Sequence, residues 1–353
     1  MIYMNLKNIM RWHSRLGLFM GAVLFLVTLS GIVLLFKSDL MWLGSEQIQL
    51  STYDQSLDRI HSSVTDNYPN HDINGYRFLG SETEPITAVI DSCDISRYVY
   101  IDRFTAQEVQ PNDFVDGFLD LVHDIHTGLI FSTLGVFIVL LCALAYLFLT
   151  VSGVILFRKQ IFNVLLFRLR RGNNKARYLH YLFGVWSIPF NFILAVSSIY
   201  LIIPQFIGSL LGSGAYAQNR DIPAKNNPTI EISLDYVQEQ TLEMYPDFQL
   251  NYLRLPNSSH PTEIKLWGNL PGAFHTGELA TEIIFNTEVN EFSISRESDH
   301  SFFTQLALAL HTLHAGQYGG VFVKVIYALF SCLLVVVNLT GYVIYIKKNN
   351  RKR

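Results

Sequence analysis

Four long apolar runs alternate with polar stretches along the chain. They cover Leu16–Phe36, Leu129–Phe157, Tyr181–Ile203 and Val321–Ile346. Each run reaches the roughly 20 residues that a helix needs to cross a hydrocarbon core of about 30 Å. Lys324 is the only Lys, Arg, Asp or Glu inside a run, and it lies about one turn from the end, where a lysine side chain can extend to the headgroups. The pattern predicts four transmembrane helices in contact with a lipid bilayer.

The two polar stretches between the first and second runs and between the third and fourth runs repeat one order of elements. The first predicts a helix over Ser56–Tyr68 and strands over Gly75–Leu79, Ile86–Ile90 and Arg97–Asp102. The second predicts a helix over Ser233–Tyr245 and strands over Gln249–Leu255, Thr262–Trp267 and Thr281–Asn286. One helix followed by several short strands predicts an α+β module with the helix on one face of an antiparallel sheet.

Charge orients these elements. Residues 1–15, 158–180 and 347–353 carry basic side chains and no acid, whereas all 29 Asp and Glu residues lie in the two long connections. Basic residues close to span ends mark the cytoplasmic side, so both termini are expected in the cytoplasm and both α+β modules outside. Topology accounts for the basic residues, and the net charge of −3 gives no reason to expect nucleic acid as a partner. The first run is longer than the core of a cleaved signal peptide, so we expect it to remain as an anchor.

The chain is a duplication. Residues 13–17 (HSRLG) align without a gap with residues 180–184 (HYLFG), and residues 123–128 (HDIHTG) align with residues 311–316 (HTLHAG). Each half has two spans, so its copy keeps the same orientation and a pseudo-two-fold axis along the membrane normal is expected. Small residues at matching positions predict close helix approach in a four-helix bundle: Gly31, Gly153, Gly341 and Ser198.

The predicted fold is therefore a mainly α membrane protein with α+β ectodomains. The expected segments are an N-terminal segment with the first span (1–36), a first outer domain (37–122), the second span (123–157), a basic cytoplasmic loop (158–180), the third span (181–203), a second outer domain (204–310), the fourth span (311–346) and a cytoplasmic tail (347–353).

Six of the 11 histidines lie at the membrane ends of these spans: His13 and His180 on the cytoplasmic side, and His123, His126, His311 and His314 on the outer side. The pseudo-two-fold axis pairs each histidine with its counterpart. A six-coordinate haem iron needs one axial ligand on each face of the ring, and helix bundles commonly hold such cofactors. The pattern predicts two haem b groups, one bound by His13 and His180 and one bound by the outer histidines.

The outer side has more histidines than one haem needs. We favour His126 and His314 as ligands, because they lie closer to the hydrocarbon and a following glycine, Gly128 or Gly316, would leave room for a macrocycle edge. His123 and His311 would then support those ligands, bind a further haem or contact the electron acceptor. A His-x-x-His pair on a helix also suits zinc or copper, although that alternative leaves the cytoplasmic pair without a role. Interfacial histidines with no ligand are the remaining alternative.

Several motifs together resemble a known family. They are residues 11–18 (RWHSRLGL) with residues 29–31 (LSG), residues 310–316 (LHTLHAG), residues 232–235 (ISLD) through 245–246 (YP), and residues 99–102 (VYID) through 108–109 (EV). Over nearly its whole length the chain resembles the PepSY-associated transmembrane proteins, which include bacterial iron-regulated inner-membrane proteins. The resemblance implies a multi-pass protein of a bacterial inner membrane with two periplasmic PepSY-like domains.

The family resemblance also implies a function, because some members are di-haem reductases of ferric siderophores. Carried over, their ligands would be His13, His180 and the outer histidines. We therefore expect a haem-dependent oxidoreductase of the ferric reductase type, which passes electrons from quinol or a soluble reductase to a ferric siderophore. No Gly-x-Gly-x-x-Gly motif opens a helix after a strand, so the electron donor is expected to be another molecule. The alternative is a non-enzymatic PepSY protein that binds peptides, regulates an envelope protease or senses metal.

Overall fold

The structure, a computed structural model, separates the chain into two compact units. The helical unit comprises Met1–Lys37, Asp116–Gly214 and Leu310–Arg353, and the sheet unit comprises Ser38–Val115 and Ala215–Ala309. Residues 5–43, 56–78, 84–92, 95–166, 168, 174–211, 228, 230, 232–270, 281–296, 299, 301–316, 318 and 320–350 are described. Parts of the predicted cytoplasmic loop, the end of the predicted strand at Leu79 and the last three residues of the tail lie outside these ranges.

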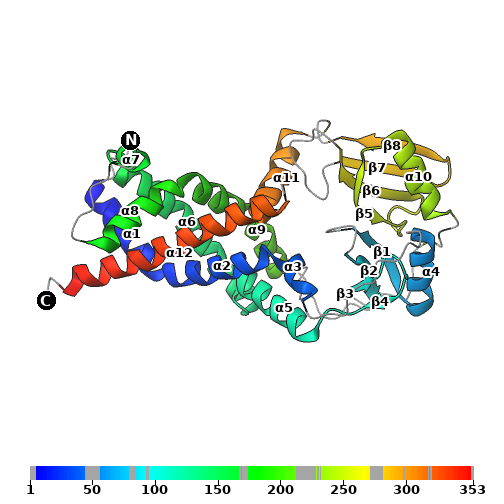
Figure 1. The fold of residues 1–353 in the computed structure, drawn as a ribbon, viewed down its shortest axis with the longest axis horizontal. Coiled ribbons are helices and arrows are strands. Elements are labelled where there is room, and N and C mark those ends of the chain that lie inside the picture. Colours follow the sequence, from blue (N-terminus) through cyan, green and yellow to red (C-terminus); the bar gives the residue numbers. More distant parts are fainter. Residues whose placement is uncertain are drawn as a thin grey trace. The chain divides into compact units, whose positions relative to one another are not determined.

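In the helical unit, each predicted span falls on a pair of consecutive helices, and in three of the four pairs the second helix is much the longer (Figure 1). The pairs are α1 (Leu6–Phe19) with α2 (Gly21–Leu34), α5 (Asp113–Gly128) with α6 (Ser132–Phe157), α8 (Lys175–Trp186) with α9 (Ile188–Leu211), and α11 (Phe302–Ala315) with α12 (Gly320–Asn350). Two short helices follow the first and second pairs: α3 (Lys37–Met41) and α7 (Ile161–Leu165).

Among the described residues, three single helices are long and apolar enough to cross a membrane: α6, α9 and α12. The first predicted span, Leu16–Phe36, is not one straight helix. It contains the end of α1 and all of α2, which meet at Met20 with a bend of 58°. The pair forms a fourth candidate span only when both helices are counted together.

The breaks between paired helices have local causes. Between α5 and α6, Leu129 and Ile130 adopt positive φ angles of 49° and 61°, a conformation that β-carbons disfavour. At the matching break between α11 and α12, Gly316 and Gly320 have φ of 64° and 62°, which glycine adopts without that cost. The break before α9 falls at Ser187, whose hydroxyl donates to the carbonyl of Phe183.

The two halves of the helical unit pack against each other. Helix α6 of the first half packs on α9 of the second, and α12 of the second half packs on α2 of the first. Within each half, the first helix packs on the last: α1 packs on α6, and α8 packs on α12. Buried residues from both halves meet in one cluster: Leu24, Cys142, Tyr146, Ala195 and Leu334. These matching contacts agree with the duplication read from the sequence.

The sheet unit contains two copies of one helix and four strands. The first copy has α4 (Leu57–Asn67), β1 (Asp72–Arg77), β2 (Ile86–Ser92), β3 (Ile95–Ile101) and β4 (Glu108–Val109). The second has α10 (Leu234–Met244), β5 (Gln249–Arg254), β6 (Glu263–Asn269), β7 (Thr281–Asn286) and β8 (Glu291–Ser295). The predicted helices and strands are all present, and β4 and β8 add an edge strand to each copy.

The two copies are not separate sheets. All eight strands form one antiparallel sheet in the order β4-β3-β2-β1-β5-β6-β7-β8. The copies join where β1 pairs with β5, with Tyr76 opposite Leu253 and Arg77 opposite Tyr252. The sequence predicts two outer domains, whereas the structure places both segments in one unit with a shared sheet.

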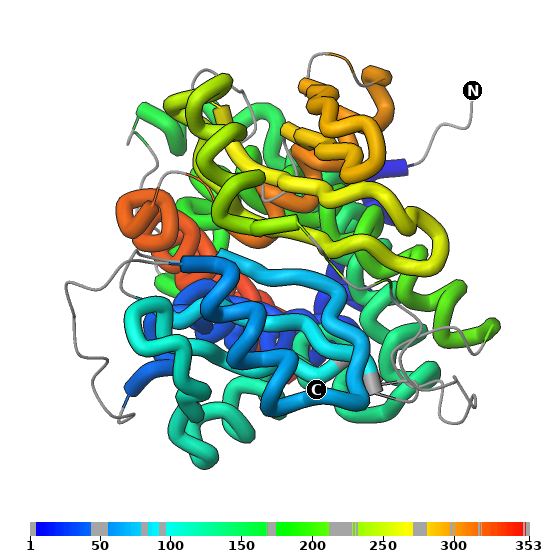
Figure 2. Tube along the Cα trace, turned by 90° about the vertical axis from the view of Figure 1, so that its right-hand side faces the viewer, coloured from blue at the N-terminus to red at the C-terminus, as the bar shows by residue number. Residues whose placement is uncertain are grey.

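Helices α4 and α10 lie on the same face of this sheet (Figure 2). Apolar residues of both helices and of strands from both copies share one core, including Ile60, Val64, Tyr76, Val237 and Leu253. The two helices therefore bury this face of the sheet. The core cluster includes no helix on the opposite face.

The two helices also cap each other at their first turns. The carboxylate of Asp58 in α4 accepts hydrogen bonds from the hydroxyl of Ser233 at 2.5 Å and the amide of Leu234 at 2.6 Å, at the start of α10. Asp235 in α10 does the same for the start of α4, at 2.6 and 2.5 Å. These bonds satisfy N–H groups that a helix cannot pair internally. Each helix start therefore depends on the other copy.

Candidate functional site

Two histidines from matching helices face each other in the helical unit. The ring centroids of His126 on α5 and His314 on α11 lie 6.1 Å apart, with the ring planes inclined by 56°. Two imidazole nitrogens bound to one metal ion, each at about 2 Å, place their ring centroids roughly 6 Å apart. The spacing of this pair therefore fits one metal ion between the two rings.

Both rings of this pair are held at Nδ1. His126 Nδ1 lies 2.9 Å from the carbonyl oxygen of Val27 and 3.2 Å from the hydroxyl of Ser30, both on α2. A carbonyl oxygen only accepts, so this Nδ1 carries the proton. His314 Nδ1 lies 3.0 Å from the hydroxyl of Ser197, which itself donates to the carbonyl of Ile193 at 2.8 Å. The serine thus accepts from His314 as well, and Nε2 is left with its lone pair on both rings.

The second histidine pair is held in the same way. His180 Nδ1 lies 2.9 Å from the carbonyl oxygen of Val337 and 3.3 Å from the hydroxyl of Thr340 on α12. His13 Nδ1 lies 2.7 Å from the hydroxyl of Ser152 on α6, near enough for Ser152 to accept from it. Donation from Nδ1 to a protein oxygen is the arrangement that orients a metal-binding imidazole and fixes its tautomer. His13 and His180 also lie near each other.

Three of the four small residues singled out in the sequence lie beside these rings. A Cβ atom at Gly31 would lie 3.0 Å from Cε1 of His126, and one at Gly341 would lie 3.3 Å from Cε1 of His180. A Cβ at Gly153 would lie 3.9 Å from Cε1 of His13, which is ordinary contact. These glycines accommodate imidazole rings, a role more specific than the close helix packing predicted for them.

The glycines that follow the outer histidines do not have the predicted role. A Cβ added to Gly128 would contact Val136 of α6, and the backbone of Gly128 lies directly against Gly135. A Cβ added to Gly316 would contact Leu35 and Tyr327. Protein atoms fill the space that was assigned to a macrocycle edge, so this reason for preferring His126 and His314 is wrong. The facing of the two rings is the better reason.

The other two outer histidines point elsewhere. The side chain of His123 is 54% exposed, and its Nδ1 lies 3.8 Å from a carboxylate oxygen of Asp124. His311 is likewise exposed. Neither belongs to the ring pair formed by His126 and His314.

Among the described residues, no three His, Cys, Asp or Glu side chains gather as a metal-binding group. A structural zinc site uses four such ligands, whereas a six-coordinate haem iron can take two histidines and its porphyrin. The donor set at each end of the helical unit, two histidines with their Nδ1 atoms engaged, thus suits a haem.

The apolar helices and the antiparallel sheet unit define a membrane protein with an α+β domain. The family model of the PepSY-associated TM region matches residues 10–348, and the chain belongs to this family. The family resemblance read from the sequence is confirmed. A search of curated proteins finds no match to the chain.

The sequence analysis missed the oxygen partners of the histidines. These are the hydroxyls of Ser30, Ser152, Ser197 and Thr340. The signal was present, because each of these residues is followed by a glycine or serine and occupies the same place in both halves. Small residues in membrane helices usually indicate close packing, and the sequence alone does not show which of them lie beside a histidine of a neighbouring span.

Proposed function

We propose that this chain is a di-haem b-type cytochrome of the bacterial inner membrane that reduces a ferric siderophore in the periplasm. The facing of His126 and His314, with 6.1 Å between ring centroids, is the observation that carries the proposal. When bound, haem b supplies a one-electron redox centre. Reduction of ferric iron weakens its hold on hard oxygen ligands, so the reaction would release iron from the siderophore.

In this proposal the chain's own residues bind and orient the cofactors. His126 and His314 hold one haem, and His13 and His180 hold the other. The hydroxyls and carbonyls at Nδ1 keep each ring in one orientation and make it a stronger ligand. The arrangement of both pairs across the two halves follows from the duplication.

The donor in this proposal is a quinol from the membrane or a soluble reductase. An apolar cavity of about 390 Å³ in the helical unit favours a quinol as the donor, and its lining includes Phe25 and Leu26. Asn338 also lines this cavity, and its buried Nδ2 has no hydrogen-bond partner among the described residues.

The proposed topology places both termini and the 158–180 connection in the cytoplasm, because basic residues gather there and acids do not. The sheet unit, which is built from the two acidic connections, would lie in the periplasm. This topology places the His126 and His314 pair near the periplasmic face and the His13 and His180 pair near the cytoplasmic face.

The test is the haem content of the purified full-length protein. A pyridine haemochrome assay should give two haem b groups per chain, and the Soret band should shift on reduction with dithionite. The variants His13→Ala and His180→Ala should each retain one haem. Reduced protein should be reoxidised by a ferric siderophore. Colourless protein, or normal haem content in both variants, would refute the assignment and leave the non-enzymatic PepSY alternative.

A further inference from the structure

The face of the sheet opposite α4 and α10 carries a group of aromatic and guanidinium side chains where the two copies join. We name this group the aromatic–guanidinium cluster; it consists of Arg77, Tyr98, Tyr252, Arg254 and Trp267. Successive side chains of a strand point to opposite faces, and each member is the neighbour of a core residue on its own strand. Those core residues are Tyr76, Val99, Leu253 and Leu266. The cluster therefore lies on the face opposite α4 and α10.

The members of the cluster contact each other through ring faces. The guanidinium carbon of Arg77 lies 5.6 Å from the ring centroid of Tyr98 and 5.7 Å from that of Tyr252. Tyr252 in turn stacks on Trp267, with centroids 5.6 Å apart and planes inclined by 19°. The guanidinium carbon of Arg254 lies 5.4 Å from the Trp267 centroid. The cluster crosses the seam between β1 and β5, so both copies of the duplicated module contribute to it.

The guanidinium group of Arg254 has donors to spare. Nε and Nη2 of Arg254 are buried and have no hydrogen-bond partner among the described residues. A buried donor without a partner costs free energy, and a charged donor costs more than a neutral one. Ring stacking leaves the edge of a guanidinium free, and that edge can bind a carboxylate or another anion in bidentate fashion.

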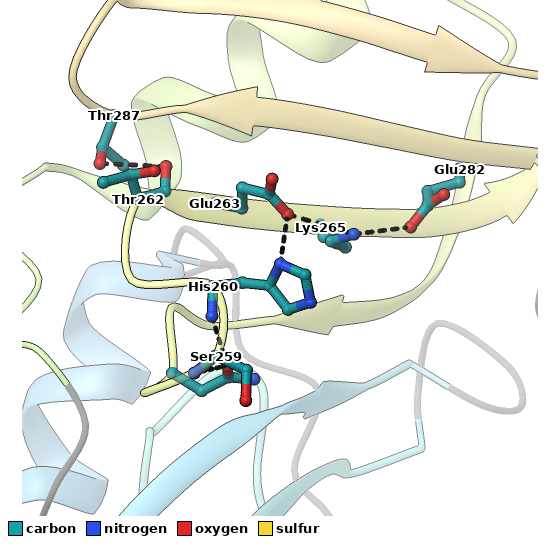
Figure 3. A network of polar contacts seen from close by, with 8 residues as sticks. Ser259, His260, Thr262, Glu263, Lys265, Glu282 and Thr287 are labelled. Atoms are coloured by element: carbon teal, nitrogen blue, oxygen red, sulfur yellow. Dashed lines mark hydrogen bonds and ion pairs between the residues drawn. The ribbon is translucent and has the colours of Figure 1, made fainter.

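Neighbouring charges on this face are already engaged. Lys265 forms ion pairs with Glu263 at 3.2 Å and with Glu282 at 3.4 Å (Figure 3). Glu263 also contacts His260 at 3.2 Å. Asp91, the acid that acts electrostatically on Tyr252, accepts a hydrogen bond of 2.6 Å from Asn74. The acids nearest the cluster therefore have partners other than its two arginines.

The cluster is also accessible in part. Tyr98 is 50% exposed, and the other four members are half-buried. Burial raises the pKa of Tyr252, although the two nearby arginines oppose the shift. Its phenol is thus neutral at physiological pH and offers a ring face and a hydroxyl.

We propose that the aromatic–guanidinium cluster binds an anionic aromatic chelate, with the aromatic rings of the ligand stacked on the cluster and its negative charge on Arg77 and Arg254. Aromatic faces favour aromatic ligands, and desolvated guanidinium groups favour anions. This inference rests on the proposed function, and it narrows the substrate to ferric complexes of catecholate type over aliphatic hydroxamate complexes.

The experiment measures binding without electron transfer. Full-length protein in nanodiscs is titrated calorimetrically with the gallium(III) complex of 2,3-dihydroxybenzoate, since gallium(III) is not reduced under these conditions. The gallium(III) complex of acetohydroxamate is the comparison probe. We expect the wild-type protein to bind the catecholate complex at least tenfold more tightly than the hydroxamate complex.

Four variants locate the binding. Arg77→Gln and Arg254→Gln should each weaken catecholate binding by roughly tenfold or more, as expected for the loss of a charge-assisted contact. Tyr98→Leu should weaken it several-fold, and this half-exposed position tolerates the change without unfolding. Arg97→Gln is the matched control, because Arg97 is an exposed arginine of the same strand as Tyr98 on the opposite face. Its binding should equal that of the wild type.

The outcomes separate this proposal from the proposed function. Equal binding by all four variants, or no preference for the catecholate probe, would overturn the binding site. The haem spectrum is recorded on the same samples. Normal haem with failed binding refutes only the cluster, whereas absent haem with intact binding refutes only the electron-transfer function.

Discussion

The substitution Gly31→Ala should weaken haem binding at the His126 and His314 pair. The added Cβ would lie 3.0 Å from Cε1 of His126, well inside ordinary van der Waals contact. The ring cannot move freely, because its Nδ1 is held by the carbonyl of Val27 at 2.9 Å. The ring must therefore tilt by a few tenths of an ångström or lose that hydrogen bond.

The magnitude follows from the cost of overpacking. An extra methyl group forced into a packed site costs about 1–3 kcal/mol. If this cost falls on the haem-bound form, haem affinity falls by about 5- to 150-fold. Glycine-to-alanine changes also favour a helix by roughly 1 kcal/mol, so a control with the same helix effect is needed.

Gly153→Ala supplies that control, since its Cβ would lie 3.9 Å from Cε1 of His13 and meet no crowding. Gly341→Ala is intermediate, with 3.3 Å to Cε1 of His180. Haem loss to excess apomyoglobin, followed by absorbance, ranks the three variants. The expected order of loss rates is Gly31→Ala, then Gly341→Ala, then Gly153→Ala. Equal rates for all three would show that these glycines do not border haem ligands.

Three further predictions concern single side chains. Ser152→Ala should weaken haem retention about tenfold, the low end for loss of a hydrogen bond that orients a metal ligand. Ser30→Ala should have a smaller effect, because the carbonyl of Val27 still accepts from Nδ1 of His126. Rates of haem transfer compare the two variants. His126→Ala should remove one haem in a haemochrome assay, while the exposed His123→Ala should remove none, and the reverse result would exchange their roles. Asp235→Ala should destabilise the sheet unit by about 1–2 kcal/mol, because it removes the carboxylate that accepts from the Ser56 hydroxyl and the Leu57 amide at the start of α4. A lower melting temperature is expected, and an unchanged one would count against the reciprocal caps.

Much of the fold could be predicted because its patterns are strong. Apolar runs of membrane-spanning length and strands with alternating burial are properties of local sequence, so α6, α9, α12 and most strands were found. The bend at Met20 could not be read in the same way, because an apolar run gives no sign of a break. The single sheet was also missed, since the pairing of β1 with β5 joins segments that are distant in the chain.

One pairing at the candidate site could be predicted from repetition. Matching histidines in both halves indicated which residues face each other, and the structure brings His126 and His314 together. The reason given for that pair was wrong, because Gly128 and Gly316 contact protein atoms. Which atom lies beside a glycine depends on how two distant helices cross, and one sequence contains no direct record of that.

The reciprocal helix caps have an evolutionary consequence. A chain consisting of one half would keep the N-cap serine of its own helix but lack the carboxylate that accepts from the first backbone N–H, and it would leave the β1 edge of its four-stranded sheet open. A second copy of that chain would supply the missing carboxylate and the missing strand neighbour at the same time. The ancestor of this protein, before its gene was duplicated, is therefore best understood as a symmetric homodimer, and fusion made the partnership permanent while allowing the two copies to diverge.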